Sequence, residues 1–241
     1  MIEISGMYLV LPSIADPHIG GLDDCSRRRL KTALPDAQEL ALGFEADSRM
    51  SPGTAKTAIE ALGKSGKIRR NGRIVDLPIG HGCREIDFGR GPKLAMPIPW
   101  GDVATAFHTT GIPNITVFTP ISPSLLALAR LMNAFGFILR SRHVQAWLIE
   151  RVEKTVKGPD AAARDASPTW LWGEAKDASG RSKEIRIASL NGYSLTVLSS
   201  LALVERLIAN GFAPGCWTPA RIMGEDFILS VPGTTVLELP R

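Results

Sequence analysis

Four side chains that could bind or orient a small molecule lie close together in the middle of the chain: Trp100, Asp102, His108 and Thr110. Two apolar runs, Leu94–Ile98 and Ile115–Phe118, flank them, so the pattern predicts strand, turn, short helix, turn and strand. A rigid scaffold can present polar groups at strand ends to a ligand. The four are therefore candidate substrate-binding residues, whereas no spacing of carboxylates identifies a catalytic residue.

A structural role also explains these residues. Asp102 can cap a helix over Val103–Thr109, and His108 and Thr110 can help to end it. The two interpretations are compatible, because a capped helix can also line a pocket.

Several kinds of chemistry have no signature in this sequence. The Gly-rich fingerprint of dinucleotide binding is missing, because Gly89-Arg90-Gly91 lacks a third glycine and Pro92 follows. A phosphate-binding Walker loop, a GxSxG nucleophile turn and an HExxH zinc motif are also missing. The cysteines, Cys25, Cys83 and Cys216, are far apart and odd in number, so we expect no metal site, no disulfide framework and a cytoplasmic location.

Charge and hydrophobicity restrict the partners. The chain of 241 residues has a mild formal charge of +4, scattered and without interleaved aromatics, so we expect no nucleic acid. The segment Leu125–Leu139 is apolar nearly all round but is shorter than the roughly 20 residues that span a bilayer. It is best interpreted as a buried helix. The alternatives are a subunit interface or a lipid-facing helix, because Arg140 and Arg142 follow and could meet anionic head groups.

Periodicity and turn signals predict the remaining elements. Strands are expected at Met7–Leu11, Glu39–Phe44, Phe227–Val231 and Thr235–Leu239, and hairpins over Lys67–Leu77 and from Trp170–Lys176 to Lys183–Ile187. Helices are expected at Cys25–Leu34 after a cap at Asp23 or Asp24, from Ser51-Pro52 to Leu62, at Ser141–Val156, at Ser194–Asn210 with the core stripe Val197, Leu201, Val204 and Ile208, and after Thr218-Pro219. Residues 158–168 form a polar, mobile connector. Hairpins and segregated helices together predict an α+β fold, with a mixed or mostly antiparallel sheet and helices on one face.

Several segments together resemble one known family. They are REIDFG, PIPWGD and TGIPNITVF in the central block, SPGTAKTAIEALGKSGKIRRNGRIVD before it, and LWGEAKDASG and GYSLTVLSSLALVERLIANGFAPGCWTPARIMGEDFILSVP after it. In order and spacing they resemble the C-terminal domain of the saccharopine dehydrogenase-like family, which includes trans-acting enoyl reductases. The resemblance covers most of the chain from about residue 37 onward. Residues 1–36 diverge from the family pattern, and only Asp24 matches a family position there.

The resemblance implies that residues 1–241 are a single substrate-binding and dimerising domain of an NAD(P)-dependent oxidoreductase. In the family a preceding Rossmann domain binds NADP or NAD, so no cofactor-binding residue is expected in this chain, and the chain alone should not transfer hydride. Asp102 and His108 would then be polar anchors, and Trp100 a packing wall. The alternative is a non-catalytic oligomerisation or ligand-binding module derived from that family. The expected partners are a small-molecule substrate, and a second copy or a separate Rossmann-domain chain; peripheral membrane contact is the less favoured alternative.

Overall fold

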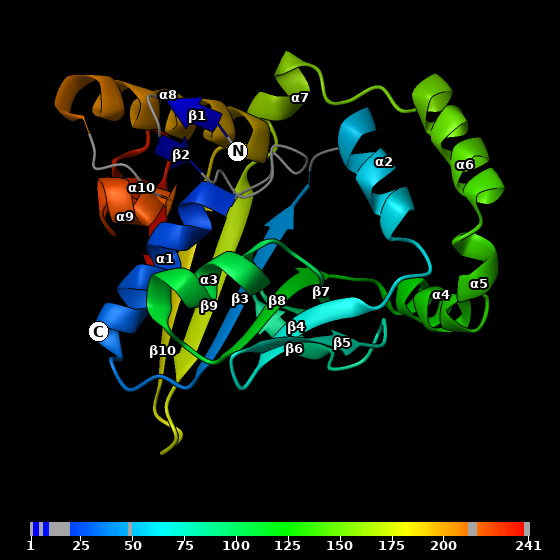
Figure 1. Cartoon of the computed structure of the whole chain (residues 1–241), viewed down its shortest axis with the longest axis horizontal. Helices are drawn as coiled ribbons and strands as arrows, with labels where there is room; N and C mark the ends of the chain where they lie inside the picture. The colour runs from blue at the N-terminus through cyan, green and yellow to red at the C-terminus, as the bar shows by residue number, and fades with distance from the viewer. Residues whose placement is uncertain (1, 5–6, 10–19, 48–49, 212–215, 239–241) are drawn as a thin grey trace.

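The computed structural model describes residues 2–4, 7–9, 20–47, 50–211 and 216–238. Within these residues the main feature is a nine-stranded mixed sheet with helices on one face, which confirms the α+β class (Figure 1). Its strands are β3 (Glu39–Ala46), β4 (Gly66–Arg70), β5 (Arg73–Leu77), β6 (Arg84–Asp87), β7 (Pro92–Ile98), β8 (Asn114–Pro120), β9 (Thr169–Lys176), β10 (Ser182–Ser189) and β12 (Thr235–Glu238). Residues 12–21 are rich in Pro, Gly and Asp, which predicts a loop, and all of them except Gly20 and Gly21 lie outside the described residues.

The sheet is mostly antiparallel. Its order is β12-β10-β9-β3-β8-β4-β5, and the β6–β7 hairpin joins it through β7, which pairs with β8. Among the described strand pairs of this sheet, only β3 and β8 run parallel. A small second sheet contains β1 (Ile2–Ile4), β2 (Met7–Leu9) and β11 (Cys216–Trp217).

One face of the large sheet carries the main core. Helices α1 (Gly20–Ala33) and α3 (Asp102–Thr110) lie on this face and pack against each other. Helices α8 (Gly192–Asn210), α9 (Pro219–Met223) and α10 (Phe227–Ser230) contact α1 from the other side. The core therefore consists of apolar side chains from α1, the central strands and these helices, among them Leu30, Leu42, Ile115, Ile187 and Leu195.

The opposite face is partly covered by the β6–β7 hairpin. Phe88, Phe118 and Trp172 are buried there in a smaller cluster. Charged side chains surround it: Arg84 lies over the Trp172 ring, 4.7 Å from its centroid, and pairs with Glu174 at 2.8 Å. This face is closed by cation–π contacts and ion pairs, so it needs no helix layer.

Four helices form an arm beside the sheet, and we use this name for α2 (Pro52–Ala61), α4 (Pro123–Ala134), α5 (Gly136–Leu139) and α6 (Arg142–Thr155) (Figure 1). Helix α2 packs on α6, and Lys56 pairs with Glu153 between them. The helices of the arm make more contacts with one another than with the sheet. It therefore stands beside the main core and does not cover it.

Local signals placed several elements correctly. Ser51 caps α2 through a bond from the Thr54 backbone nitrogen to its hydroxyl, and Pro52 follows, as predicted. Asn71 and Gly72 take positive φ angles of 49° and 77° in the β4–β5 turn, which is the backbone that this dipeptide favours. The β9–β10 hairpin and β12 also lie where they were expected.

The prediction for Leu125–Leu139 was wrong. The segment forms two helices that break at Phe135, and of its large side chains Leu126 is buried while Leu125, Leu128 and Leu131 are exposed. A helix at the edge of the molecule buries only the side that faces the body, however apolar its other sides are.

Three further predictions need correction. Helix α8 buries Leu195, Ser199, Leu203 and Leu207, whereas the predicted stripe of Val197, Leu201, Val204 and Ile208 faces largely outward. Phe227–Val231 forms helix α10 and no strand, because a short apolar run fits either state. Asp24 lies inside α1 and does not cap it. Residues 158–168, which were expected to form a connector, contain the short helix α7 (Ala161–Asp165).

Glycine at position 63 is required where the arm meets itself. Gly63 has φ +73°, and an added Cβ would lie 2.5 Å from the Gly136 carbonyl oxygen. Gly111 has nearly the same φ, +71°, with no atom within 4 Å of an added Cβ. We expect Gly111→Ala to cost about 1 kcal/mol from backbone strain alone, and Gly63→Ala to cost about 1–3 kcal/mol more because of the clash. Urea unfolding of both variants measures the difference, and equal losses would show that the arm yields freely at Gly63.

Candidate functional site

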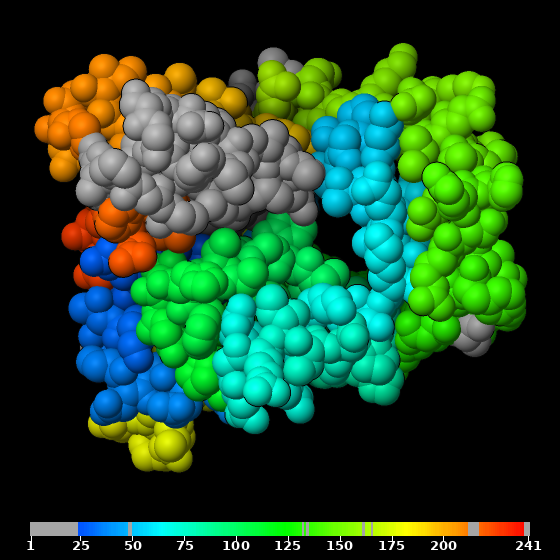
Figure 2. Space-filling model, in the orientation of Figure 1, coloured from blue at the N-terminus to red at the C-terminus, as the bar shows by residue number. Residues whose placement is uncertain are grey.

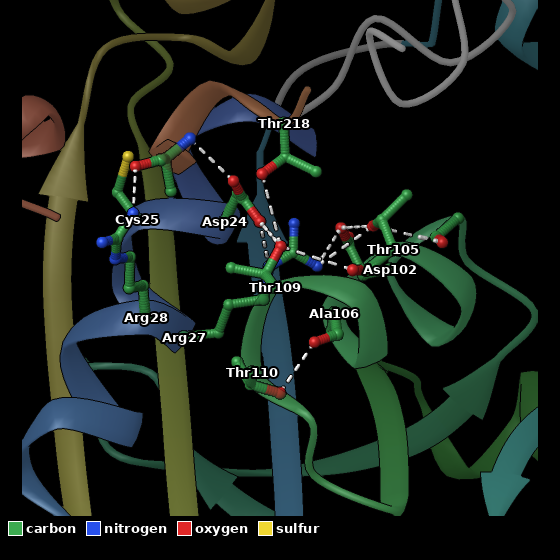
Figure 3. A network of polar contacts seen from close by, with 12 residues as sticks. Asp24, Cys25, Arg27, Arg28, Asp102, Thr105, Ala106, Thr109, Thr110 and Thr218 are labelled. Atoms are coloured by element: carbon green, nitrogen blue, oxygen red, sulfur yellow. Dashed lines mark hydrogen bonds and ion pairs between the residues drawn. The ribbon is translucent and has the colours of Figure 1, made fainter. Parts of the chain in front are cut away.

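A buried arginine connects the helices of the core. Arg27 of α1 has no exposed side-chain surface and lies between two equally buried carboxylates (Figure 3). Its Nε donates to Asp24 Oδ1 at 3.0 Å, and its Nη1 donates to Asp102 Oδ1 at 2.8 Å. The same nitrogen donates to the Thr105 hydroxyl at 3.2 Å. The cluster therefore joins α1 to the first turn of α3.

Asp24 extends this cluster to a third helix. Its Oδ2 accepts the Ala220 backbone nitrogen at the start of α9, at 2.7 Å. Its Oδ1 accepts the Thr109 hydroxyl at 2.6 Å, and that hydroxyl lies 3.4 Å from the hydroxyl of Thr218. A single carboxylate thus fixes α1, α3 and α9 relative to one another.

Asp102 is less well satisfied. Its Oδ2 is buried and has no hydrogen-bond partner among the described atoms. Burial raises the pKa of this carboxyl and the nearby Asp24 adds to the rise, although the Arg27 guanidinium opposes it. Two carboxylates share one guanidinium here, so a proton on Asp102 would leave the cluster neutral.

The structure separates the four candidate residues. Thr110 is buried, donates to the Ala106 carbonyl at 2.7 Å and accepts from the Ile112 nitrogen at 3.2 Å, so it ends α3 as the structural interpretation expected. His108 is exposed and lies edge-on to Phe107. Asp102 does not cap α3 with its side chain. Of the four residues, only Trp100 lines the large cleft between the sheet and the arm.

The cleft lies between the sheet and the arm and has a volume of about 940 Å³. A hollow in this position is visible between α2 and the body of the molecule (Figure 2). Trp100 packs on Phe44 with ring centroids 4.7 Å apart, and both rings line the cleft. On the arm side the lining includes Leu125, Ala129 and Phe137. The walls are thus mostly apolar, which is typical of sites for apolar ligands.

Two cations line the cleft beside Gly63. Lys64 and Arg140 are both exposed, and the Arg140 Cγ lies 3.2 Å from where a Gly63 Cβ would stand. Arg140 donates to the Gly136 carbonyl at 3.3 Å, and neither cation pairs with a carboxylate among the described ion pairs. An apolar cleft with two exposed cations in its lining fits an apolar ligand with an acidic group.

Sequence reasoning missed Arg27, Phe44, Lys64 and Arg140 as parts of these features. Arg27 was hidden in the run Arg27-Arg28-Arg29, which reads as surface charge. The one signal for it was helical spacing, because Asp24 and Arg27 stand three residues apart and face the same side of a helix.

Cys25 is buried, and its burial decides its chemistry. Burial raises the pKa of the Cys25 thiol to about 12, so this thiol is a poor nucleophile. In the part of the chain that the structure describes, no cluster of three or more His, Cys, Asp or Glu side chains could hold a metal ion.

Removing Arg27 should destabilise the fold strongly. In Arg27→Met two buried carboxylates lose their cation, and we expect a loss of about 3–5 kcal/mol in unfolding free energy. Arg29→Met on the same helix is the matched control, because its partner Asp226 is 74% exposed, and the expected loss is below about 1 kcal/mol. Chemical denaturation of both variants measures this. Similar losses would show that the buried cluster contributes no more than a surface pair.

The raised pKa of Asp102 also predicts a pH dependence. The folded state holds the proton above the unfolded pKa of about 3.9, so stability should fall as pH rises from that value through the raised folded pKa. The slope is at most about 1.4 kcal/mol per pH unit for one proton. Asp102→Asn should lack this component and retain the bond from Arg27. Unfolding measured between pH 4 and pH 8 tests it, and identical slopes in both proteins would contradict the shift.

Comparisons with known proteins give a distant structural likeness. No family model and no curated protein matches the chain. Among solved structures 21 chains match, and one is apo saccharopine dehydrogenase (L-Glu forming) from Saccharomyces cerevisiae. That enzyme is 12% identical with a TM-score of 0.48, and the match covers 86% of this chain and 69% of the enzyme. At this level the likeness gives no information about substrate or activity.

Proposed function

We propose that residues 1–241 form the substrate-binding half of an NAD(P)-dependent oxidoreductase that resembles the saccharopine dehydrogenase and enoyl reductase enzymes. The cleft between sheet and arm supports this most directly, because it is large, mostly apolar and lined by the aromatic pair Trp100 and Phe44. The sequence resemblance over the PIPWGD and TGIPNITVF segments supports the reductase class. The dinucleotide would be bound by a Rossmann domain outside this sequence, since no Gly-rich fingerprint occurs within it.

The proposed substrate is an apolar chain that carries an acidic group. The apolar part would lie against Trp100 and Phe44, and Lys64 and Arg140 in the cleft lining would attract the acidic group. The walls exclude water and orient the ligand, and the bound nicotinamide would supply the hydride.

Asp102 has a positioning role in this proposal. It stands two residues after Trp100, and the bond from Arg27 holds it. The turn that carries Trp100 is therefore fixed from inside the core, while the tryptophan itself faces the cleft. His108 and Thr110 line no part of the cleft and would not contact this substrate.

Blocking the cleft should remove ligand binding. Ala129 of α4 lines the cleft, whereas Ala127 on the same helix is exposed and does not. Dansylaminoundecanoic acid, a fluorescent acyl chain with a carboxylate, is a suitable probe. We expect Ala129→Trp to weaken its binding at least about tenfold by filling the cleft, and Ala127→Trp to leave it unchanged. Equal effects, or no saturable binding to the wild type, would contradict an acyl-chain site in this cleft.

Arg140 should make binding depend on the charge of the ligand. Arg140→Gln should weaken the acidic probe by about five- to tenfold, as expected for the loss of one charge-assisted bond, and leave its methyl ester unchanged. Fluorescence titrations of both probes against both proteins give the comparison. A parallel loss for acid and ester would assign Arg140 a packing role.

The cofactor assignment is tested separately with NADPH alone. We expect no saturable binding of NADPH to residues 1–241, and reduction of a substrate only after a Rossmann-domain chain is added. Tight NADPH binding would overturn the proposal that the cofactor half lies elsewhere. Ligand binding without reduction in the reconstituted protein would instead favour the non-catalytic ligand-binding module.

A further inference from the structure

The arm exposes an apolar stripe that no described part of the chain covers. Leu128 and Leu131 of α4 and Phe135, which follows the helix, recur at helical spacing and are 50%, 60% and 49% exposed. Trp147 of α6 is 59% exposed on the same arm. Single exposed apolar residues are ordinary, but a run along one helix face marks an interaction surface.

Helix α4 is held so that this stripe stays outward. Arg130 donates twice to the Gly80 carbonyl, at 3.1 and 2.8 Å, and Asn133 donates to the Ile79 carbonyl at 3.0 Å. Leu126 is buried on the same side. These contacts fix the rotation of the helix, so the leucines of the stripe cannot turn inward without breaking them.

The arm that carries the stripe also carries basic side chains without a carboxylate partner in the described ion pairs. From Val103 to Ile149 the sequence contains no aspartate or glutamate. Arg142 and Arg151 on α6 are exposed, and no carboxylate pairs with either in the described ion pairs. The two glutamates of α6 are already neutralised, since Glu150 pairs with Lys154 and Glu153 pairs with Lys56.

We propose that the arm docks peripherally on an anionic lipid surface. Exposed apolar side chains and arginines without a carboxylate partner on one arm suit the boundary between head groups and acyl chains, and an exposed tryptophan beside Arg151 suits the same depth. Helix α4 covers only Pro123–Ala134, which is too short to cross a bilayer, so the contact lies in the plane of the surface.

A second copy of the chain fits this surface less well. A symmetric dimer would bring the stripe of one protomer against the stripe of the other. The arginines of the two arms, which pair with no carboxylate in the described ion pairs, would then add repulsion between like charges, which opposes association. An anionic membrane supplies the missing negative charge.

The cleft gives the docking a consequence, and this step depends on the proposed function. Leu125 and Phe137 line the cleft and are also 54% and 70% exposed on the arm. Helix α4 therefore carries the stripe and also forms part of the cleft wall. Docking would then bring the cleft close to an apolar substrate held in the membrane.

Vesicle flotation tests the docking without any substrate or cofactor. The full chain is mixed with vesicles of phosphatidylcholine alone or with 30% phosphatidylserine, at low and high salt. We expect binding only to the anionic vesicles, weakened by salt. Leu128→Glu with Leu131→Glu, and separately Arg142→Glu with Arg151→Glu, should each reduce binding at least about tenfold.

Matched variants elsewhere serve as controls. Ile74→Glu places an acidic residue on an exposed apolar position of β5, which is 48% exposed, and Arg70→Glu with Arg73→Glu reverses two exposed charges on the same hairpin. Both variants should bind vesicles like the wild type. Equal losses in test and control variants, absent binding to anionic vesicles, or a dimer that the stripe variants abolish in sedimentation would each overturn the proposal. None of these outcomes bears on NADPH or acyl-probe binding.

Discussion

The fold depends on one buried cation that two buried carboxylates share. Arg27 holds Asp24 and Asp102, and Asp24 in turn holds the backbone at the start of α9. Burying such a group is costly unless every charge is paired, so the three helices must keep their relative positions for the cluster to exist at all. The guanidinium is a planar, rigid donor that reaches the two partners through two different nitrogens. Directional hydrogen bonds therefore hold the core together, in addition to apolar burial.

The two walls of the cleft differ in how they are supported. The wall with Trp100 and Phe44 belongs to the sheet and to the turn before α3, both of which are tied to the main core. The other wall belongs to the arm. The helices of the arm approach one another closely at Gly63 and Gly136, and a few hydrogen bonds attach the arm to the body. A ligand would thus be positioned by the sheet and enclosed by the arm. The width of the cleft depends on elements with few contacts to the core, and such elements are the ones that move most easily in proteins.

The sequence was informative wherever a local rule decides the structure. Ser51-Pro52 began a helix and Asn71-Gly72 turned a hairpin, because capping and positive φ angles are properties of the residues themselves. The sequence was not sufficient where contacts with other elements decide which side chains are buried. Helix α8 is apolar nearly all round, so its buried side was chosen by α1 and α9, and the period alone could not select it. Arg27 looked like surface charge, because nothing local shows that two carboxylates from separate helices will enclose it. Trp100 and Asp102 were predicted to act together, yet two residues of chain turn one into the cleft and the other into the core.

The exposed apolar side chains of α4 contribute little to the stability of the fold. Helix α4 buries Leu126 and fixes itself through Arg130, so the fold gains little from apolar residues on its outer side. Exposed leucines there lower solubility and expose the chain to self-association. A protein that only bound a water-soluble ligand would not need them, since the cleft is lined from the inner side. The stripe, the arginines without a carboxylate partner and one wall of the cleft belong to the same arm. If the arm docks as proposed, access to an apolar substrate held in an anionic lipid surface would account for all three.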